Sequence, residues 1–282
     1  MKNNFHIIKP VVLWLFLSII LNVQAQKHLI ILHTNDTHSR IEPMPHKDAE
    51  FPDKGGVLRR SAFVEAVKKE NASVLLLQAG DIVQGTPYFN LFSGKMDIEV
   101  MNVLGYDASC LGNHEFDLGL DSLYKLIKSA NFPFVATNYD FDETVLKGLT
   151  KKYVILKKDG IKIGIIGIGV NPEGLITDKN YAGMKYSDPI TAANETASFL
   201  KKKEKCDIVI CLSHLGFYKD ETIMGDIKLV KNTNNIDVVI GGHSHTFLSQ
   251  PHYEQNIAGK KVIITQMGKN GIYVGRLDVL FF

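Results

Sequence analysis

Five short segments of this sequence concentrate side chains that can bind metal ions or transfer protons. They are Asp36-Thr37-His38, Gly80-Asp81, Gly112-Asn113-His114-Glu115, His214 and Gly241-Gly242-His243-Ser244-His245. Each segment follows a short apolar run that is typical of a buried strand. Because ligands of open α/β sheets bind beyond the carboxyl ends of the strands, we expect the five segments to meet in one cleft.

The donor types in these segments indicate transition-metal chemistry. Two Asp, one Asn and four His supply oxygen and nitrogen donors without thiolate, which suits zinc, manganese, iron or cobalt better than calcium. Asp36 and His38 are two residues apart on an extended segment, so both point to the same side and can bind one ion. His243 and His245 stand in the same relation.

The number of donors indicates two ions. The set comprises Asp36, His38, Asp81, Asn113, His214, His243 and His245. Seven donors exceed one four-coordinate site but fit two divalent cations that share a carboxylate, for which Asp81 is the natural bridge. Two ions about 3.5–4 Å apart can activate a water molecule and hold a phosphoryl group. Taken alone, an Asp-x-His pair can be a surface pair and His214 a core histidine; five such segments at strand ends favour the metal site.

His114 follows Asn113 directly, so it is expected beside the metals without binding them. Asp117, three residues on, can accept a hydrogen bond from the imidazole ring and fix its orientation. A histidine held in this way can stabilise a phosphoryl transition state or protonate the leaving group. Glu115 is expected to be structural rather than catalytic. Asn35 is either a turn residue or a hydrogen-bond donor to Asp36.

Short apolar runs alternate with amphipathic stretches, which favours an α/β fold. Strands are expected at residues 28–33, 74–78, 108–111, 134–136, 153–156, 162–168, 208–212, 238–240, 262–265 and 273–280, and helices at 57–69, 87–104, 120–129 and 189–203. No internal repeat or long linker is found, so residues 26–282 are expected to form one domain.

Residues 1–25 resemble a signal peptide. A polar, basic start precedes an apolar run at residues 10–23, and small residues follow at Val23-Gln24-Ala25. A membrane anchor is the alternative, but the run is shorter than the roughly 20 residues that cross a bilayer. The protein is therefore expected to be exported, periplasmic or secreted, with no membrane span in the mature chain.

The balance of charged residues bears on which macromolecules the protein can bind. The formal net charge is +2, and removal of the leader with Lys2 and Lys9 balances basic and acidic residues. This predicts no binding of nucleic acid polymers.

The odd number of cysteines, Cys110, Cys206 and Cys211, leaves at least one unpaired. Their positions favour buried strand thiols over a disulfide framework, with the pairing left open.

At these motifs the sequence resembles the calcineurin-like metallophosphoesterases, and among them the metal-binding half of the 5′-nucleotidase family. The resemblance rests on residues 29–39, 80–89, 106–117 and 241–246. It implies an α/β/β/α sandwich of four layers with two mixed sheets. It also implies one metal held by Asp36, His38, Asp81 and His245, and another held by Asp81, Asn113, His214 and His243. By the same resemblance His114 stabilises the transition state, with Asp117 as its partner.

The departure from the family is expected at the carboxyl end. Residues 266–271 and 273–278 resemble the end of the family's metal domain, so the second domain, which recognises the nucleoside, is expected to be absent from residues 26–282. Two explanations stay open. Either a separate polypeptide supplies that domain to a split 5′-nucleotidase, or this domain acts alone as a broad phosphoesterase on small phosphate esters.

Other activities and another function class are compatible with the same motifs. A two-metal centre can also serve a cyclic-nucleotide phosphodiesterase or a nucleotide-sugar pyrophosphatase. A non-catalytic module that only holds a phosphorylated ligand is a further alternative. The pairing of His114 with Asp117 argues against that module, since binding alone does not need it.

Overall fold

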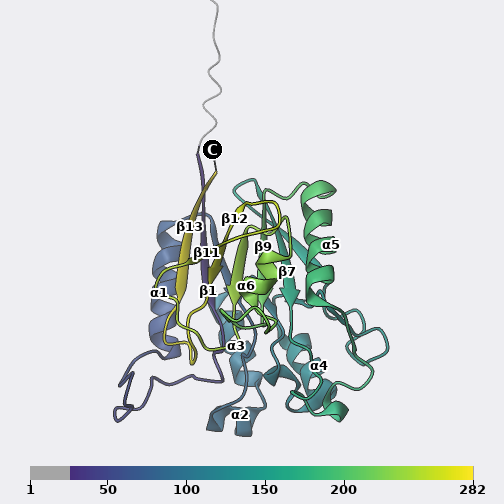
Figure 1. Ribbon diagram of the computed structural model, residues 1–282. Coiled ribbons are helices and arrows are strands. Elements are labelled where there is room, and N and C mark those ends of the chain that lie inside the picture. Colours follow the sequence, from purple (N-terminus) through teal and green to yellow (C-terminus); the bar gives the residue numbers. More distant parts are fainter. Residues whose placement is uncertain (1–25, 282) are drawn as a thin grey trace, which may run out of the picture.

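Two mixed β-sheets occupy the centre of the computed structural model, which describes residues 26–281 (Figure 1). The first sheet has the order β13 (Gly275–Phe281), β1 (Lys27–Thr34), β2 (Val74–Gln78), β3 (Ala108–Cys110) and β4 (Phe134–Val135). Its strands are parallel except β13, which pairs antiparallel with β1. The start of β1 therefore lies beside the end of β13, and its other end leads to the first donor segment.

The second sheet contains six strands. Its order is β11 (His252–Gln255), β12 (Lys261–Thr265), β10 (Val238–Gly241), β9 (Ile208–Ser213), β7 (Ile161–Ile168) and β6 (Tyr153–Lys158). The four inner strands are parallel, and the two edge strands run antiparallel to their neighbours. A separate pair joins β5 (Tyr139–Asp140) to β8 (Lys185–Tyr186).

Helices cover the outer face of each sheet. On the first sheet lie α1 (Val57–Glu70), α3 (Lys95–Leu104) and α4 (Gly119–Ser129); on the second lie α5 (Pro189–Lys202) and α6 (Asp226–Lys231). Figure 1 shows α1 at the left of the sheets and α5 at the right. The short helix α2 (Pro87–Phe92) and the 3₁₀ turns η1 (His114–Phe116) and η2 (Asp178–Asn180) lie in connections.

Alternating apolar side chains on the strands produce this layering. In β1, Leu29 and Ile31 pack between the two sheets, whereas Ile30 and Leu32 pack under the helices of the first sheet. A strand buried on both faces reads as a continuous apolar run because successive side chains point to opposite faces. The predicted four-layer α/β/β/α sandwich with two mixed sheets is confirmed.

One predicted helix is wrong. Residues 87–104 form two helices, α2 and α3, because Ser93 (φ 49°) and Gly94 (φ 85°) adopt the left-handed conformation between them. The elements α6, β5, β8 and β11 were not predicted from the sequence. The other predicted strands and helices are present, with ends that differ by a few residues.

The predicted signal peptide lies outside the described residues. Within residues 26–281, no helix combines the length and apolar character needed to cross a bilayer. The three cysteine side chains are buried and form no disulfide. Cys110 and Cys211 lie in strands, as expected, whereas Cys206 lies just before β9.

Candidate metal centre

The five donor segments converge beyond the carboxyl ends of strands from both sheets. Four follow the parallel strands β1, β2, β9 and β10, and the fifth follows β3. The side chains form two groups, and within each group the ligand atoms all lie within 4.8 Å of one another. The first group is Asp36, His38, Asp81 and His245, and the second is Asp81, His214 and His243. Asp81 belongs to both groups, which is the position of a bridging carboxylate.

The first group is a tight cluster of nitrogen and oxygen donors. The Nε2 atoms of His38 and His245 lie 3.0 Å apart. Asp36 Oδ1 lies 3.4 Å from His245 Nε2 and 3.9 Å from His38 Nε2. Burial lowers the pKa of His38 despite the nearby carboxylates of Asp81 and Asp36. A neutral imidazole offers a lone pair, which is the form that binds a metal.

The predicted donor Asn113 lies beside the second group. Its Oδ1 lies 2.9 Å from Nδ1 of His243, and burial lowers the pKa of His243 to about 4. All seven predicted donors therefore lie in one contiguous cluster. His243 and His245, however, belong to different groups rather than to one. Both have positive φ (71° and 53°), and so do Asp36 and His38 (49° each), so neither segment is extended as the sequence predicted and its side chains do not alternate as in a strand.

His214 tests whether the cluster fits a cation. Its Nδ1 lies 2.7 Å from the carbonyl oxygen of Ala79 and donates a hydrogen bond to it. Its Nε2 is buried without a hydrogen-bond partner and lies 3.1 Å from Asp81 Oδ2. Burial opposes protonation of His214, but the Asp81 carboxylate outweighs it and raises the pKa of His214 to about 10. The same pairing lowers the pKa of Asp81. A divalent cation between His214 Nε2 and Asp81 Oδ2 would replace the proton that the pair holds, so these two buried atoms fit a metal ion.

The backbone around the donors is strained. Five of the seven donors, Asp36, His38, Asp81, His243 and His245, have φ between 49° and 71°. Non-glycine residues seldom adopt this conformation, and such residues gather at functional sites. Two glycines permit the close approach of the segments: a Cβ at Gly112 would overlap Asp81 Oδ1, and one at Gly242 would lie 2.5 Å from the Ala79 oxygen.

His114 and Asp117 form the predicted pair. Nδ1 of His114 lies 2.8 Å from Oδ2 of Asp117, and this hydrogen bond raises the pKa of His114. The ring of His114 packs edge-on against that of His38 with their centroids 5.4 Å apart. Its side chain is 31% exposed, so a substrate can reach it. The pair can therefore present a positively charged imidazolium beside the metal donors.

Glu115, for which the sequence predicted only a structural role, holds two donor segments together. Its carboxylate accepts hydrogen bonds from the backbone N–H groups of Asp81 (3.0 Å), Ile82 (2.7 Å) and Gly112 (2.6 Å). It thereby joins the donor segments after β2 and β3. Burial raises its pKa to about 7. No sequence motif marks a carboxylate that binds backbone N–H groups across two loops.

Asn35 also supports the donors. Its Nδ2 donates to Asp36 Oδ2 (2.7 Å) and to the Gly268 carbonyl oxygen (2.7 Å), and its Oδ1 accepts from the Met267 N–H (2.8 Å). The hydrogen bond to Asp36 orients a carboxylate of the first group, as partners of metal ligands commonly do.

The fold and donor cluster match a described family. Residues 29–247 match the model of the calcineurin-like phosphoesterases. The chain belongs to the calcineurin-like phosphoesterase family. A 5′-nucleotidase of Vibrio cholerae is 36% identical over 276 residues, which cover 90% of this chain and 49% of that protein.

Solved structures of the family agree with this assignment. A 5′-nucleotidase precursor of Thermus thermophilus superposes with a TM-score of 0.83 at 34% identity, covering 91% of this chain and 52% of that one. A calcineurin-like phosphoesterase of Bacillus subtilis, YfkN, gives 0.75 at 28% identity and covers 90% and 85%. The chain spans about half the length of the curated relatives it matches. The phosphoesterase domain is thus of the 5′-nucleotidase type, and the family together with the Asp/His cluster indicates a site for two divalent cations.

Proposed function

We propose that this domain hydrolyses phosphate esters with two divalent cations. Asp36, His38, Asp81 and His245 would hold one cation, and Asp81, Asn113, His214 and His243 the other. The two donor groups that share Asp81 carry this proposal. When bound, the cations supply Lewis-acid polarisation of the phosphoryl group and of the attacking water. The donor types suit zinc, manganese, iron or cobalt.

His114 is the side chain that we propose acts on the phosphoryl group directly. Its hydrogen bond to Asp117 fixes the ring and favours the imidazolium form. An imidazolium beside the phosphoryl site can stabilise the charge that develops on phosphoryl oxygens, or protonate the leaving oxygen.

The substrate we propose is a nucleotide phosphomonoester. Two observations support it: the relatives named 5′-nucleotidases, and a cavity of about 370 Å³ that His245 lines together with Phe51, Phe247 and Tyr273. The rings of Phe247 and Tyr273 stack with centroids 4.2 Å apart, and Phe51 packs edge-on against Tyr273. Such an aromatic wall beside the metals suits a planar leaving group.

Selectivity for the nucleoside is proposed to require a separate specificity domain, as in a split 5′-nucleotidase. The 5′-nucleotidases that the chain matches extend over about twice the matched length, so their selectivity can involve residues outside the matched half. The test compares AMP with an aryl phosphate, a cyclic nucleotide and a nucleotide sugar, using the purified protein loaded with zinc or manganese. Hydrolysis of AMP and the aryl phosphate at similar kcat/KM is expected. A strong preference of the isolated chain for AMP would contradict the need for another domain.

The same assay distinguishes catalysis from binding. Preferential cleavage of the cyclic nucleotide or the nucleotide sugar would replace the phosphomonoesterase assignment. No hydrolysis of any substrate, with two cations per chain verified by elemental analysis, would favour a module that only binds phosphorylated ligands.

We also propose that the protein is exported. The basic start, apolar run and small residues within residues 1–25 support this. Mass spectrometry of the protein from the periplasm or medium should show that the mature chain starts near Gln26. A chain that keeps Met1 and stays in the cytoplasm would contradict export.

A further inference from the structure

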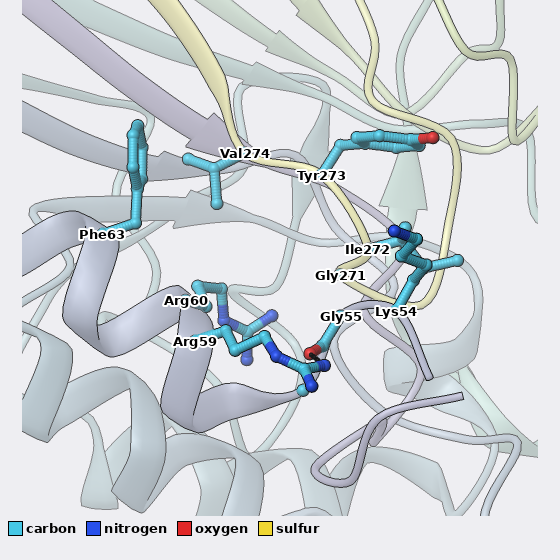
Figure 2. A pocket seen from close by; sticks show the side chains of 10 residues that line it. Lys54, Gly55, Arg59, Arg60, Phe63, Gly271, Ile272, Tyr273 and Val274 are labelled. Atoms are coloured by element: carbon cyan, nitrogen blue, oxygen red, sulfur yellow. Dashed lines mark hydrogen bonds between the residues drawn. The ribbon is translucent and has the colours of Figure 1, made fainter. Parts of the chain in front are cut away.

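A second cavity, of about 320 Å³, lies between the start of α1 and the segment that precedes β13 (Figure 2). It is lined by Lys54, Gly55, Gly56, Arg59, Arg60, Phe63, Gly271, Ile272, Tyr273 and Val274. None of the seven metal donors lines it. Three of the lining side chains are cationic and none carries a carboxylate, so the cavity is suited to an anion.

Arg60 is the decisive residue of this cavity. It is only 7% exposed, and its guanidinium makes no hydrogen bond or ion pair within residues 26–281. Its Nη1 lies against Gly271, where a Cβ would overlap it. Figure 2 shows Arg59 and Arg60 extending from α1 toward Gly55 and Gly271. Arg59, in contrast, donates to the carbonyl oxygens of Asp53 (2.5 Å) and Gly55 (3.1 Å). The Nε of Arg60 is buried without a hydrogen-bond partner, and because a buried charge without a partner is costly, an anion beside the guanidinium would be favourable.

The carboxyl group of Asp97 does not fill that role. Arg60 favours its ionised form, yet the two groups form no ion pair within 4.0 Å. Asp97 Oδ2 instead accepts a hydrogen bond from Ser39 Oγ at 2.8 Å. Burial raises the pKa of Asp97 to about 7, so near neutral pH this group carries only part of a negative charge.

The start of α1 adds a second source of positive potential. The helix has 14 residues, its N-cap is Gly56 without a side-chain acceptor, and its first turn has no acidic residue. The amino end of a helix carries a partial positive charge that favours anions. Arg59 and Arg60, at the third and fourth helical positions, add cations where the helix dipole already disfavours them. An anion beside Gly55 and Gly56 would offset all of these charges.

We propose that this cavity binds a phosphate-type oxyanion, either inorganic phosphate or the phosphate group of a nucleotide, at a site separate from the metal centre. Arg60 and Arg59 are the principal partners and Lys54 contributes from the rim. This binding does not depend on the proposed hydrolysis, because no metal donor takes part in it. The site nevertheless adjoins the metal centre through the Asn270 N–H, which donates to the Asp36 carbonyl oxygen at 2.7 Å beside Gly271.

The test measures phosphate binding to metal-free protein by calorimetry, since bound cations would also attract phosphate. Arg60→Met should weaken binding by at least about tenfold, as expected for the loss of a charge-assisted hydrogen bond. Lys54→Met should weaken it by roughly threefold, because Lys54 is exposed and screened. Lys128→Met removes an exposed lysine on α4 and should leave the affinity unchanged. A second titration with AMP identifies the source: tighter binding of AMP than of phosphate assigns the site to nucleotides, and equal or weaker binding assigns it to inorganic phosphate.

Thermal unfolding provides a second measurement that a purely structural role of Arg60 would not reproduce. Phosphate should raise the Tm of the parent protein and leave that of Arg60→Met unchanged. If Arg60→Met does not fold, the variants Lys54→Met and Arg60→Lys test the proposal in its place. Both should bind phosphate more weakly than the parent. The proposal is overturned if the parent binds no phosphate at about 10 mM, or if the folded variants bind it as tightly as the parent. Neither result would bear on whether the metal-loaded protein hydrolyses phosphate esters.

Discussion

Replacement of Glu115 by Gln tests how the donor segments are held together. In the parent, Oε2 of Glu115 accepts from the N–H groups of Asp81 and Gly112, and Oε1 accepts from that of Ile82. A glutamine has one acceptor oxygen and one NH2 group. In either orientation of the amide, its NH2 must face at least one backbone N–H, so at least one buried donor loses its partner.

The expected cost follows from these contacts. A hydrogen bond to a charged group contributes about 1.5–3 kcal/mol, and an unpaired buried N–H costs a similar amount. At about pH 8, where Glu115 with its pKa of about 7 is mostly ionised, one bond is lost and two are weakened by loss of the charge, so Glu115→Gln should lower the free energy of unfolding of the metal-free protein by about 2–4 kcal/mol. Because Asp81 moves with its loop, the affinity for divalent cations should fall roughly 10–100-fold.

Urea unfolding followed by circular dichroism measures the first quantity, and competition with a coloured chelator measures the second. Glu65→Gln is the matched control. Glu65 lies exposed on α1 and contacts only Ser61 Oγ at 3.0 Å, so this variant should change the stability by no more than about 0.5 kcal/mol. If Glu115→Gln matches the control in both stability and metal affinity, the role assigned to Glu115 is refuted.

Further substitutions test the other parts of the site. His114→Ala should lower kcat by about 10²–10⁴-fold while elemental analysis still finds two cations per chain; loss of the metals instead would assign His114 a ligand role. Asp117→Asn should reduce kcat less than His114→Ala does, as measured in the same assay. Gly112→Ala should abolish metal binding in a chelator competition, because its Cβ would overlap Asp81 Oδ1. Asp97→Asn should become steadily more stable relative to the parent between pH 4 and pH 7. Burial raises the Asp97 pKa to about 7, so between pH 4 and pH 7 the folded parent holds a proton that the unfolded chain releases. The parent therefore loses stability as the pH rises, whereas the variant does not. A constant difference in the free energy of unfolding between parent and variant over this pH range would contradict the prediction.

Much of the fold could be predicted because its strands are apolar on both faces. In β1 and β2 every second side chain packs against a helix layer and the others against the second sheet, so the segments read as unbroken apolar runs. The edge strand β11 has no such run, because its residues His252–Gln255 alternate between partly buried and exposed. The break between α2 and α3 did have a signal, since Gly94 follows Ser93 in the middle of the predicted helix.

The set of donors could be predicted from the residues, whereas its division into two groups came only from the resemblance to the family. Chain order and the strand-end rule brought Asp36, Asp81 and Asn113 into one cluster. The spacing of His243 and His245 does not reveal their separation, because neither residue lies in an extended segment. Similarly, the role of Glu115 depends on three N–H groups from two loops, and only the folded structure brings these together.

The backbone strain at the donors and the unpaired Nε2 of His214 indicate that bound cations would stabilise the folded protein. Five donors occupy a disfavoured backbone conformation, and His214 Nε2 faces Asp81 Oδ2 without a hydrogen bond. Each strained residue costs about 1–3 kcal/mol, and the cores of both sheets hold the donor loops in place against that cost. Because cations would bind the folded cluster and not the unfolded chain, their binding should stabilise the fold in proportion to the logarithm of their concentration. Bound cations would therefore offset strain that the two apolar sheets otherwise hold in place.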